Sequence, residues 1–411
     1  MFVHYEKEKN RFPIKIWLAE RNDIDENCLE QAINLSNLPF IHKWVSLMPD
    51  THMGKGMPIG GVIACDNVVI PNAVGVDIGC GMAFTETNIP AQLLKDTMTG
   101  SGSLIHTIVG NILRSVPTGY AHFKSKQESA VIDKAFEEIE RYKKDEELIP
   151  QIEDGYFQVG TLGGGNHFIE LQQDENGNTC IMLHSGSRHF GNQIGQHFNA
   201  IARELNARWF SDVPDKYNLP FLPADSDEGQ RYIEYMQLAM NFAYENRARM
   251  LSTVKRIVSE MVEKHLGLTV EYTNEINCHH NYASLETHFD KQVWVHRKGA
   301  VKAENGELTI IPGAMGSYSY IAMGLGNPDS FRSCSHGAGR LYSRTSAVNE
   351  FSVEKVMVDL KNQGVVLGKH NKSDVAEECR FAYKDIDTVM ANEKDLVIPV
   401  KKMFTIGVVK G

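Results

Sequence analysis

Apolar residues along this chain fall into two patterns, one typical of strands and one typical of helices. Short apolar runs bounded by Gly, Pro and Asn lie at residues 44–48, 58–64 and 68–71, and each predicts a strand. The apolar runs at 179–184, 292–298, 308–311 and 404–409 predict four more strands. Strands are therefore expected in both halves of the chain.

Helical spacing dominates the middle of the chain. Apolar residues at 194, 198, 201 and 205 predict a helix that begins at Asn192. A longer helix is predicted over 226–266, bent or broken once, with Asp225 and Glu228 as a capping box and Gly267 at its end. We expect an exposed, charged helix at 128–147, a loop or insertion at 213–225, and two short helices opened by Ser352 and Ser373.

These elements predict an α+β fold. The residues that carry candidate chemistry are spread from position 77 to position 336, so one shared site requires the chain to close on itself across most of its length. A single domain over residues 1–411, with a helical insertion at about 190–266, fits this better than two independent domains.

Composition is that of a globular protein, with 42% hydrophobic and 23% charged residues among 411. The net charge of −10 opposes long-range attraction to nucleic acid, but a local basic patch is enough for phosphate contacts. Seven cysteines without a CxxC pair predict reduced thiols and a cytoplasmic protein. The chain contains no run of the roughly 20 apolar residues that span a membrane, so we expect no membrane partner.

Six potential metal ligands lie in short glycine-rich segments. Glycine lets the backbone reach left-handed angles and approach a bound group closely, so the pattern predicts one constructed metal site. The six residues are Asp77, Cys80, His167, His184, His280 and His336.

Other interpretations of these residues stay open at this point. A lone buried Cys or His is usually a packed or hydrogen-bonded core residue. If the set binds metal, a thiolate and several imidazoles favour zinc, iron or cobalt over manganese. His52 and His279 are further candidates, as ligands, as supports of ligands or as substrate contacts.

Ten short segments follow one another from about residue 40 to the end of the chain. They are MPDTHMGKGMPIGG, NAVGVDIGCGM, GTLGGGNHFIE, MLHSGSR, EINCHHNY, RKGAV, IIPGAMGSYSYI, CSHGAGR, YKDID and VVKG. Together they resemble the RtcB-type RNA ligases. The resemblance implies the distinctive α+β fold of that family and a GTP- and Mn(II)-dependent enzyme that joins an RNA 3′-phosphate or 2′,3′-cyclic phosphate to a 5′-hydroxyl.

The resemblance also implies roles for the candidate ligands. Asp77, Cys80 and His167 would hold one Mn²⁺, and Cys80 would bridge to a second Mn²⁺ held with His184 and His280. His336 would be the nucleophile that takes GMP from GTP, which agrees with the nucleophilicity of neutral imidazole near pH 7.

Further residues are assigned to GTP and RNA by the same resemblance. The GTP contacts would be Asn166, Phe168, Glu170, Ser319, Gly337, Gly339, Tyr383 and Lys410. The RNA phosphate contacts would be Arg188, Arg340 and Arg344, since guanidinium groups pair with phosphate at two points. Arg297 and Lys298 could extend this patch, although a solvated charged face is the simpler interpretation.

Three steps are expected from this assignment. Metal-activated water opens a cyclic phosphate, His336 passes GMP to the 3′-phosphate, and the 5′-hydroxyl displaces GMP. A phosphodiesterase without ligase activity and a non-enzymatic RNA-binding scaffold are the alternatives. The RNA could come from tRNA splicing or from RNA repair, with or without an archease-type activator.

The chain departs from the family pattern at two positions. His189 stands where a glycine is usual, and Ala314 stands where serine is expected. His189 adds an imidazole beside the expected RNA phosphates, where it could alter end recognition or be neutral.

Overall fold

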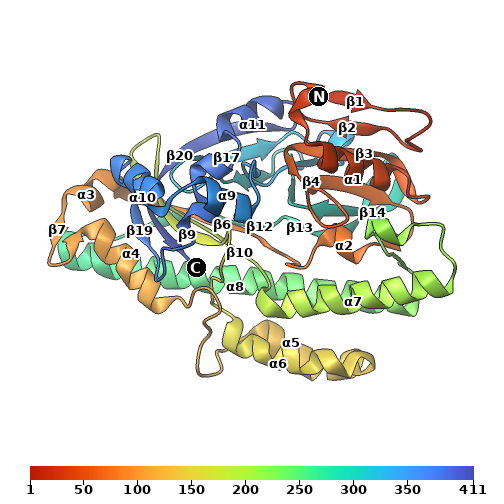
Figure 1. The fold of residues 1–411 in the computed structure, drawn as a ribbon. Helices are drawn as coiled ribbons and strands as arrows, with labels where there is room; N and C mark the ends of the chain where they lie inside the picture. The colour runs from red at the N-terminus through yellow and green to blue at the C-terminus, as the bar shows by residue number, and fades with distance from the viewer.

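Two large β-sheets organise the computed structural model, which describes residues 1–411 (Figure 1). The first has the order β1-β2-β3-β4-β14-β13, and the second has the order β12-β6-β10-β9-β20-β17-β16, with β19 paired to β20. The first contains β1 (Phe2–His4), β2 (Ile14–Ile16), β3 (Ile41–His52), β4 (Ile59–Cys65), β13 (Asn281–His288) and β14 (Lys291–Lys298). The second contains β6 (Gly81–Pro90), β9 (Phe168–Asp174), β10 (Asn178–Ser185), β12 (Tyr272–His279), β16 (Leu308–Ile311), β17 (Tyr318–Gly324), β19 (Val366–Gly368) and β20 (Val397–Lys410).

Short strand pairs and helices complete the fold. The pairs are β5 (Val68–Val69) with β11 (Leu222–Pro223), β7 (Met98–Thr99) with β8 (Gly102–Ser103), and β15 (Ala300–Lys302) with β18 (Ser333–Ser335). The α-helices are α1 (Glu26–Ser36), α2 (Pro71–Val74), α3 (Ala91–Asp96), α4 (Leu104–Ser115), α5 (Ala130–Glu137), α6 (Ile149–Gln158), α7 (Arg188–Arg208), α8 (Asp227–Leu266), α9 (Arg344–Glu350), α10 (Val353–Asn362) and α11 (Ile386–Asn392). The 3₁₀ helices are η1 (Arg21–Asp23), η2 (Ile139–Leu148), η3 (Asp215–Tyr217), η4 (Pro328–Ser330), η5 (Val375–Glu378) and η6 (Arg380–Ala382).

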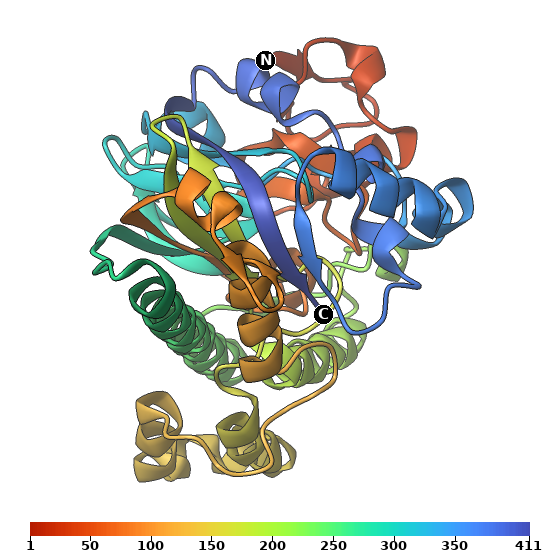
Figure 2. The same cartoon turned by 90° about the vertical axis from the view of Figure 1, so that its left-hand side faces the viewer.

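The long helix α8 supports the second sheet from below. It packs against β6, β10 and β12 and against the helices α4 and α7 (Figure 1). Its inward face repeats every four residues at Met250, Val254, Val258 and Val262, which share one core with strand residues such as Leu183. Burying each such side chain stabilises the fold by ~1.5–3 kcal/mol. The helices α5 and α6 lie below this layer in both views (Figure 2).

The α+β class expected from the sequence is confirmed, and the predicted strands are present, although β3 extends beyond 44–48 at both ends and β20 begins at Val397, seven residues before the predicted start. The strand expected at 68–71 stops at Val69, because Pro71 lacks an N–H and begins α2. The helix expected to begin at Asn192 begins at Arg188 instead, four residues earlier.

The region 190–266 is largely helical as predicted, while its status as an insertion stays a prediction. The predicted capping box of α8 is wrong, because the Ser226 side chain accepts the hydrogen bond from the Gly229 N–H at 3.0 Å. A break in this helix is excluded, since α8 runs unbroken to Gly267, which ends it at φ 66°.

Two other predicted helices differ from the structure. The charged helix at 128–147 is divided, since α5 ends at Glu137 and the 3₁₀ segment η2 contains a non-helical Asp145. No α-helix begins at Ser373, where only the 3₁₀ turn η5 follows. All seven cysteines are free. None of the helices combines the length and apolar character needed to cross a membrane.

Candidate active site

Four neighbouring strands of the second sheet bring the predicted metal ligands to one end. Cys80 precedes β6, His167 precedes β9, and His184 lies near the end of β10. Because β10 is antiparallel to both neighbours, its end meets their beginnings, and the register pairs His184 with Met82. The strand β12 ends at the same place, directly before His280.

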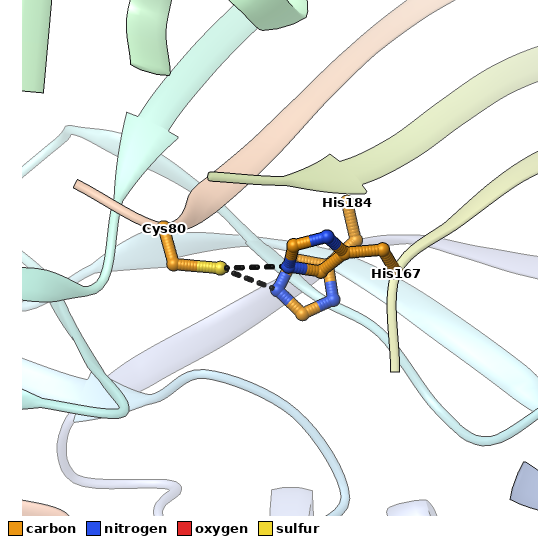
Figure 3. Close-up of side chains that lie close together, drawn as sticks. All are labelled: Cys80, His167 and His184. Carbon is orange, nitrogen blue, oxygen red and sulfur yellow. Dashed lines mark hydrogen bonds between the residues drawn. The ribbon is translucent and has the colours of Figure 1, made fainter. Parts of the chain in front are cut away.

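The ligand atoms converge on the Cys80 sulfur. The Cys80 Sγ lies 3.4 Å from His167 Nε2 and 3.2 Å from His184 Nε2 (Figure 3). On one side the Asp77 Oδ2 lies 3.1 Å from His167 Nε2, and on the other His280 Nε2 lies 3.3 Å from His184 Nε2. Cys80, His167 and His184 therefore form one group of three possible metal ligands, with Asp77 beside His167 and His280 beside His184.

The orientation of the imidazoles fits a bound cation. His167 Nδ1 lies 2.9 Å from the Leu162 carbonyl and His184 Nδ1 lies 3.3 Å from the Asn166 carbonyl. A carbonyl only accepts, so each Nδ1 carries the hydrogen and each Nε2 presents a lone pair. The His167 lone pair then faces the Asp77 carboxylate at 3.1 Å, an arrangement that a cation between them stabilises.

Burial sets the protonation of this cluster. It lowers the pKa of His184 and of His280 well below the usual range, which keeps both imidazoles neutral and able to bind metal. Burial also raises the pKa of the Cys80 thiol, an effect that a coordinated cation reverses by deprotonating the sulfur.

Asp77 is held by the loop that follows β10. The Ser187 N–H donates to Asp77 Oδ1 at 3.0 Å. A Cβ at Gly186 would overlap the same carboxylate, so the loop can approach Asp77 only with glycine at this position. The structure thus brings all five predicted ligands together.

His336 lies beside the cluster, and an aspartate holds its ring. It follows β18, and its ring centroid is 4.8 Å from that of His280. Asp50, from β3 in the first sheet, is fully buried, and its Oδ2 accepts hydrogen bonds from His336 Nδ1 at 2.6 Å and from the His336 backbone N–H at 3.1 Å. The Nε2 atom is therefore the nitrogen left free to react. Asp50 was missed from the sequence, although it stands two residues before His52.

A pocket of about 800 Å³ opens next to His336. Seven of the eight predicted GTP contacts line it: Asn166, Phe168, Glu170, Gly337, Gly339, Tyr383 and Lys410. Ser319 lies behind the wall instead, where its Oγ accepts hydrogen bonds from Gln172 Nε2 at 3.2 Å and from the Gly313 N–H at 3.1 Å. His52 and Ala314 also line the pocket.

A buried acid that the sequence did not reveal organises one wall of the pocket. Glu378 lies 2.5 Å from the Tyr383 hydroxyl, 3.1 Å from Arg340 Nη1 and 3.5 Å from Lys410 Nζ. Burial raises the pKa of Glu378, but Lys410 and Arg340 outweigh it and lower the pKa below its usual value. Arg340 also donates to the Tyr383 hydroxyl at 2.9 Å, so its guanidinium is largely committed to this wall.

The other two predicted phosphate contacts are available to a ligand. Arg188 donates to Thr161 Oγ1 at 3.2 Å and approaches His167 Nδ1 at 3.4 Å, and it forms no ion pair. Arg344 is exposed and lines both the 800 Å³ pocket and a larger groove beside it.

Three sequence candidates lie away from this site. Arg297 is fully buried and pairs with Glu286, and Lys298 is buried with its Nζ donating to the Asn72 carbonyl at 2.9 Å, so neither forms a phosphate patch or a solvated face. His279 also lies outside the cluster, since its Nδ1 is 2.9 Å from the Gly79 carbonyl.

Comparisons with known proteins agree with this arrangement. The sequence model of the family described as tRNA-splicing ligase RtcB matches residues 31–411. The chain is 38% identical to the RNA-splicing ligase RtcB of Escherichia coli K12, over 97% of each chain. It is 30% identical to the tRNA-splicing ligase RtcB of Pyrobaculum aerophilum, over 98% of this chain and 96% of that protein. The chain therefore belongs to the RtcB family.

Proposed function

We propose that this protein is an RNA ligase that uses GTP and two Mn²⁺ ions to join an RNA 3′-phosphate or 2′,3′-cyclic phosphate end to a 5′-hydroxyl end. Its relatives are named RNA-splicing and tRNA-splicing ligases. The observation that carries the proposal is the position of His336, oriented by Asp50, between the Cys/His cluster and the 800 Å³ pocket.

The first step is nucleophilic attack by His336. Asp50 accepts the Nδ1 hydrogen, so the Nε2 lone pair attacks the α-phosphorus of GTP, an N–P bond forms, and pyrophosphate leaves. The Asp50 carboxylate stabilises the positive charge that develops on the ring, as the acid of a catalytic triad does for its histidine.

The pocket walls suit a purine nucleotide. Phe168 offers an aromatic face, and Lys410 lies 5.8 Å from the centre of that ring. Glu170 and Glu378 would provide oxygens for the N–H groups of guanine, and Gly337 and Gly339 line the pocket next to His336.

The metal cluster supplies charge neutralisation. Asp77, Cys80 and His167 would hold one ion, and Cys80, His184 and His280 the other. Two bound ions would neutralise charge on the phosphate oxygens as it develops. The donor set also suits zinc, iron or cobalt, so manganese rests on the family alone.

RNA joining then proceeds through a phosphate anhydride. An oxygen of the RNA 3′-phosphate attacks the phosphorus on His336, which breaks the N–P bond and links GMP to the RNA end. The 5′-hydroxyl oxygen attacks the RNA 3′-phosphorus, a phosphodiester forms, and GMP leaves. Arg188 and Arg344 hold the RNA phosphates during these steps, and Arg340 supports Tyr383 and Glu378.

Defined RNA ends test this proposal against its alternatives. Purified protein with Mn²⁺ is mixed with a strand ending in 3′-phosphate or cyclic phosphate and a strand beginning with 5′-hydroxyl, with and without GTP. GTP-dependent joining is expected. Opening of the cyclic phosphate without joining would instead indicate a phosphodiesterase, and RNA binding without either reaction would indicate a scaffold.

A further inference from the structure

A larger groove continues from the proposed GTP pocket, and the two share Arg344. The groove is the larger of the two, with about 1860 Å³ of open space against about 800 Å³, so it has room for more than one nucleotide. Arg188 lines it and lies at the same time 3.4 Å from the metal-cluster residue His167. A chain lying in the groove would therefore have one end at the reacting centre.

One of the residues that line this groove is a fully exposed aromatic. Tyr120 has its whole side chain in solvent, with a relative exposure of 105%. It lies in the segment between α4 and α5, which passes beneath the C-terminus in Figure 1. The ring makes little packing contact with the protein and lines the groove, so it is available to a ligand there.

The turn that carries Tyr120 is anchored to the site. The Ala121 N–H donates to the Thr118 carbonyl at 3.1 Å, which closes the turn around Tyr120. The Gly119 N–H donates to the Gly163 carbonyl at 2.8 Å, in the segment that leads to His167. The backbone of the turn is thus tied to the segment that leads to the metal cluster.

Other rings lie near Tyr120 in the same groove. His122 and His189 are exposed and Phe157 is half-buried, and all three line it. Nucleic-acid bases stack on aromatic side chains, and each stacked base is worth about 1–3 kcal/mol. The groove therefore provides π-faces for bases next to cations for phosphates.

The charged residues that line the groove include two arginines and several acids. Arg188 forms no ion pair, and the nearest acid to Arg344 is Glu378 at 3.9 Å. Among the acids that line the groove, Asp374 pairs with Lys369 at 3.2 Å, whereas Asp154 and Glu377 form no ion pair and would repel phosphate. The two arginines suit a bound phosphate, and the aromatic side chains suit a bound base.

We propose that this groove binds the end of the RNA strand that carries the 3′-phosphate, with the terminal phosphate at Arg188 and Arg344 and the terminal base stacked on Tyr120. The identity of this strand rests on the proposed ligase function. Tyr120 is a binding residue in this arrangement, and His122, Phe157 and His189 complete the walls around the base.

Direct RNA binding tests the inference. Fluorescence anisotropy of a labelled single-stranded RNA with a 3′-phosphate is measured with Mn²⁺ and without GTP. Tyr120→Ala should weaken binding about 5- to 100-fold, the range that corresponds to a lost stacked base, while Tyr120→Phe should bind like wild type. Phe210→Ala is the matched control, because Phe210 is 91% exposed but lies in a different surface depression.

A second RNA separates stacking from a general effect on the surface. A strand whose terminal nucleotide lacks its base should bind wild type and Tyr120→Ala equally weakly. The inference would be overturned if Tyr120→Ala weakened binding of this strand as much as it weakens binding of the complete strand. Wild-type affinity of Tyr120→Ala for the complete strand would also overturn it. So would equal wild-type affinity for 3′-phosphate and 3′-hydroxyl strands, because the arginines would then hold no terminal phosphate.

Failure of the ligase proposal would be visible separately. Tyr120 is absent from the pocket around His336, so Tyr120→Ala should form the protein–GMP adduct at the wild-type rate. If wild type formed no adduct but RNA binding still depended on Tyr120, the ligase chemistry would be refuted and the groove assignment retained. The reverse pattern would refute the groove assignment alone.

Discussion

The carboxylate of Asp50 accepts a hydrogen bond from Nδ1 of His336 at 2.6 Å and a second from the backbone N–H of the same residue at 3.1 Å. The two residues are 286 positions apart and belong to different parts of the fold. This pair fixes the tautomer of the imidazole, and its free Nε2 is the atom on which the proposed chemistry depends.

Asp50→Asn should therefore suppress guanylylation. An asparagine can donate its amide hydrogen to Nδ1, which favours the tautomer with hydrogen on Nε2 and removes the nucleophilic lone pair. We expect the rate of protein–GMP formation to fall at least about 100-fold, since replacing the comparable triad aspartate costs about 10⁴. The measurement is single-turnover labelling with GTP, and a rate within a few-fold of wild type would contradict the role of Asp50.

Two adjacent histidines provide a matched test of the metal site. His280 Nε2 faces the cluster, whereas His279 Nδ1 contacts the Gly79 carbonyl. His280→Ala should reduce bound Mn²⁺ from two ions to one, and His279→Ala should retain two. Cys80→Ala should weaken both sites, because its sulfur is shared. Metal content after equilibrium dialysis checks this, and equal retention by all three variants would refute the assigned ligands.

Gly299 provides space for the ring of His336. A Cβ at this position would lie 2.9 Å from His336 Cε1 and overlap Ile59, whereas a Cβ at Gly306 would meet nothing within 4 Å. Both glycines have positive φ, so both alanine variants carry a strain of about 1–2 kcal/mol. Gly299→Ala should slow adduct formation more than about 10-fold, and Gly306→Ala should lower only the free energy of unfolding. Equal adduct rates in the two folded variants would contradict this account.

A buried acid behind His336 predicts a pH dependence of stability. Burial raises the pKa of Glu393 to about 8, although the hydrogen bonds that its carboxylate accepts from Ser335 oppose the shift. The folded protein therefore holds this proton more tightly than the unfolded chain, and the associated stability, present in full below about pH 4.5, is lost as the pH rises to about 8.

Comparison with Glu393→Gln isolates this contribution. Between pH 5 and 8, the free energy of unfolding of wild type should fall relative to that of the variant by up to ~1.4 kcal/mol per pH unit. Urea unfolding at several pH values measures the difference. A difference that stays constant, or that grows in favour of wild type as pH rises, would exclude a raised pKa.

Capping residues made some helix ends predictable from the sequence. Gly267 ends α8 because glycine accepts the left-handed angle there, and Ser352 caps α10 as expected. The cap of α8 itself was misplaced by one residue, since Asp225 and Ser226 are both good caps and packing decides between them.

Long-range contacts explain what the sequence did not reveal. Asp77, Cys80, His167, His184 and His280 were predicted to be metal ligands because each residue type binds metal and stands among glycines. No such signal surrounds Asp50 or Glu378, because tertiary packing of separate segments brings each of them to its partner. Arg297 shows the opposite case, where a charge that resembles a surface residue is buried against Glu286.

Mass spectrometry of the protein after incubation with GTP and Mn²⁺ tests the central claim most directly. The account predicts one covalent GMP, attached through a phosphoramidate bond to His336, which disappears in His336→Ala and is retained in the adjacent-site control His279→Ala. A GMP attached to another residue, or an adduct that persists in His336→Ala, would contradict it.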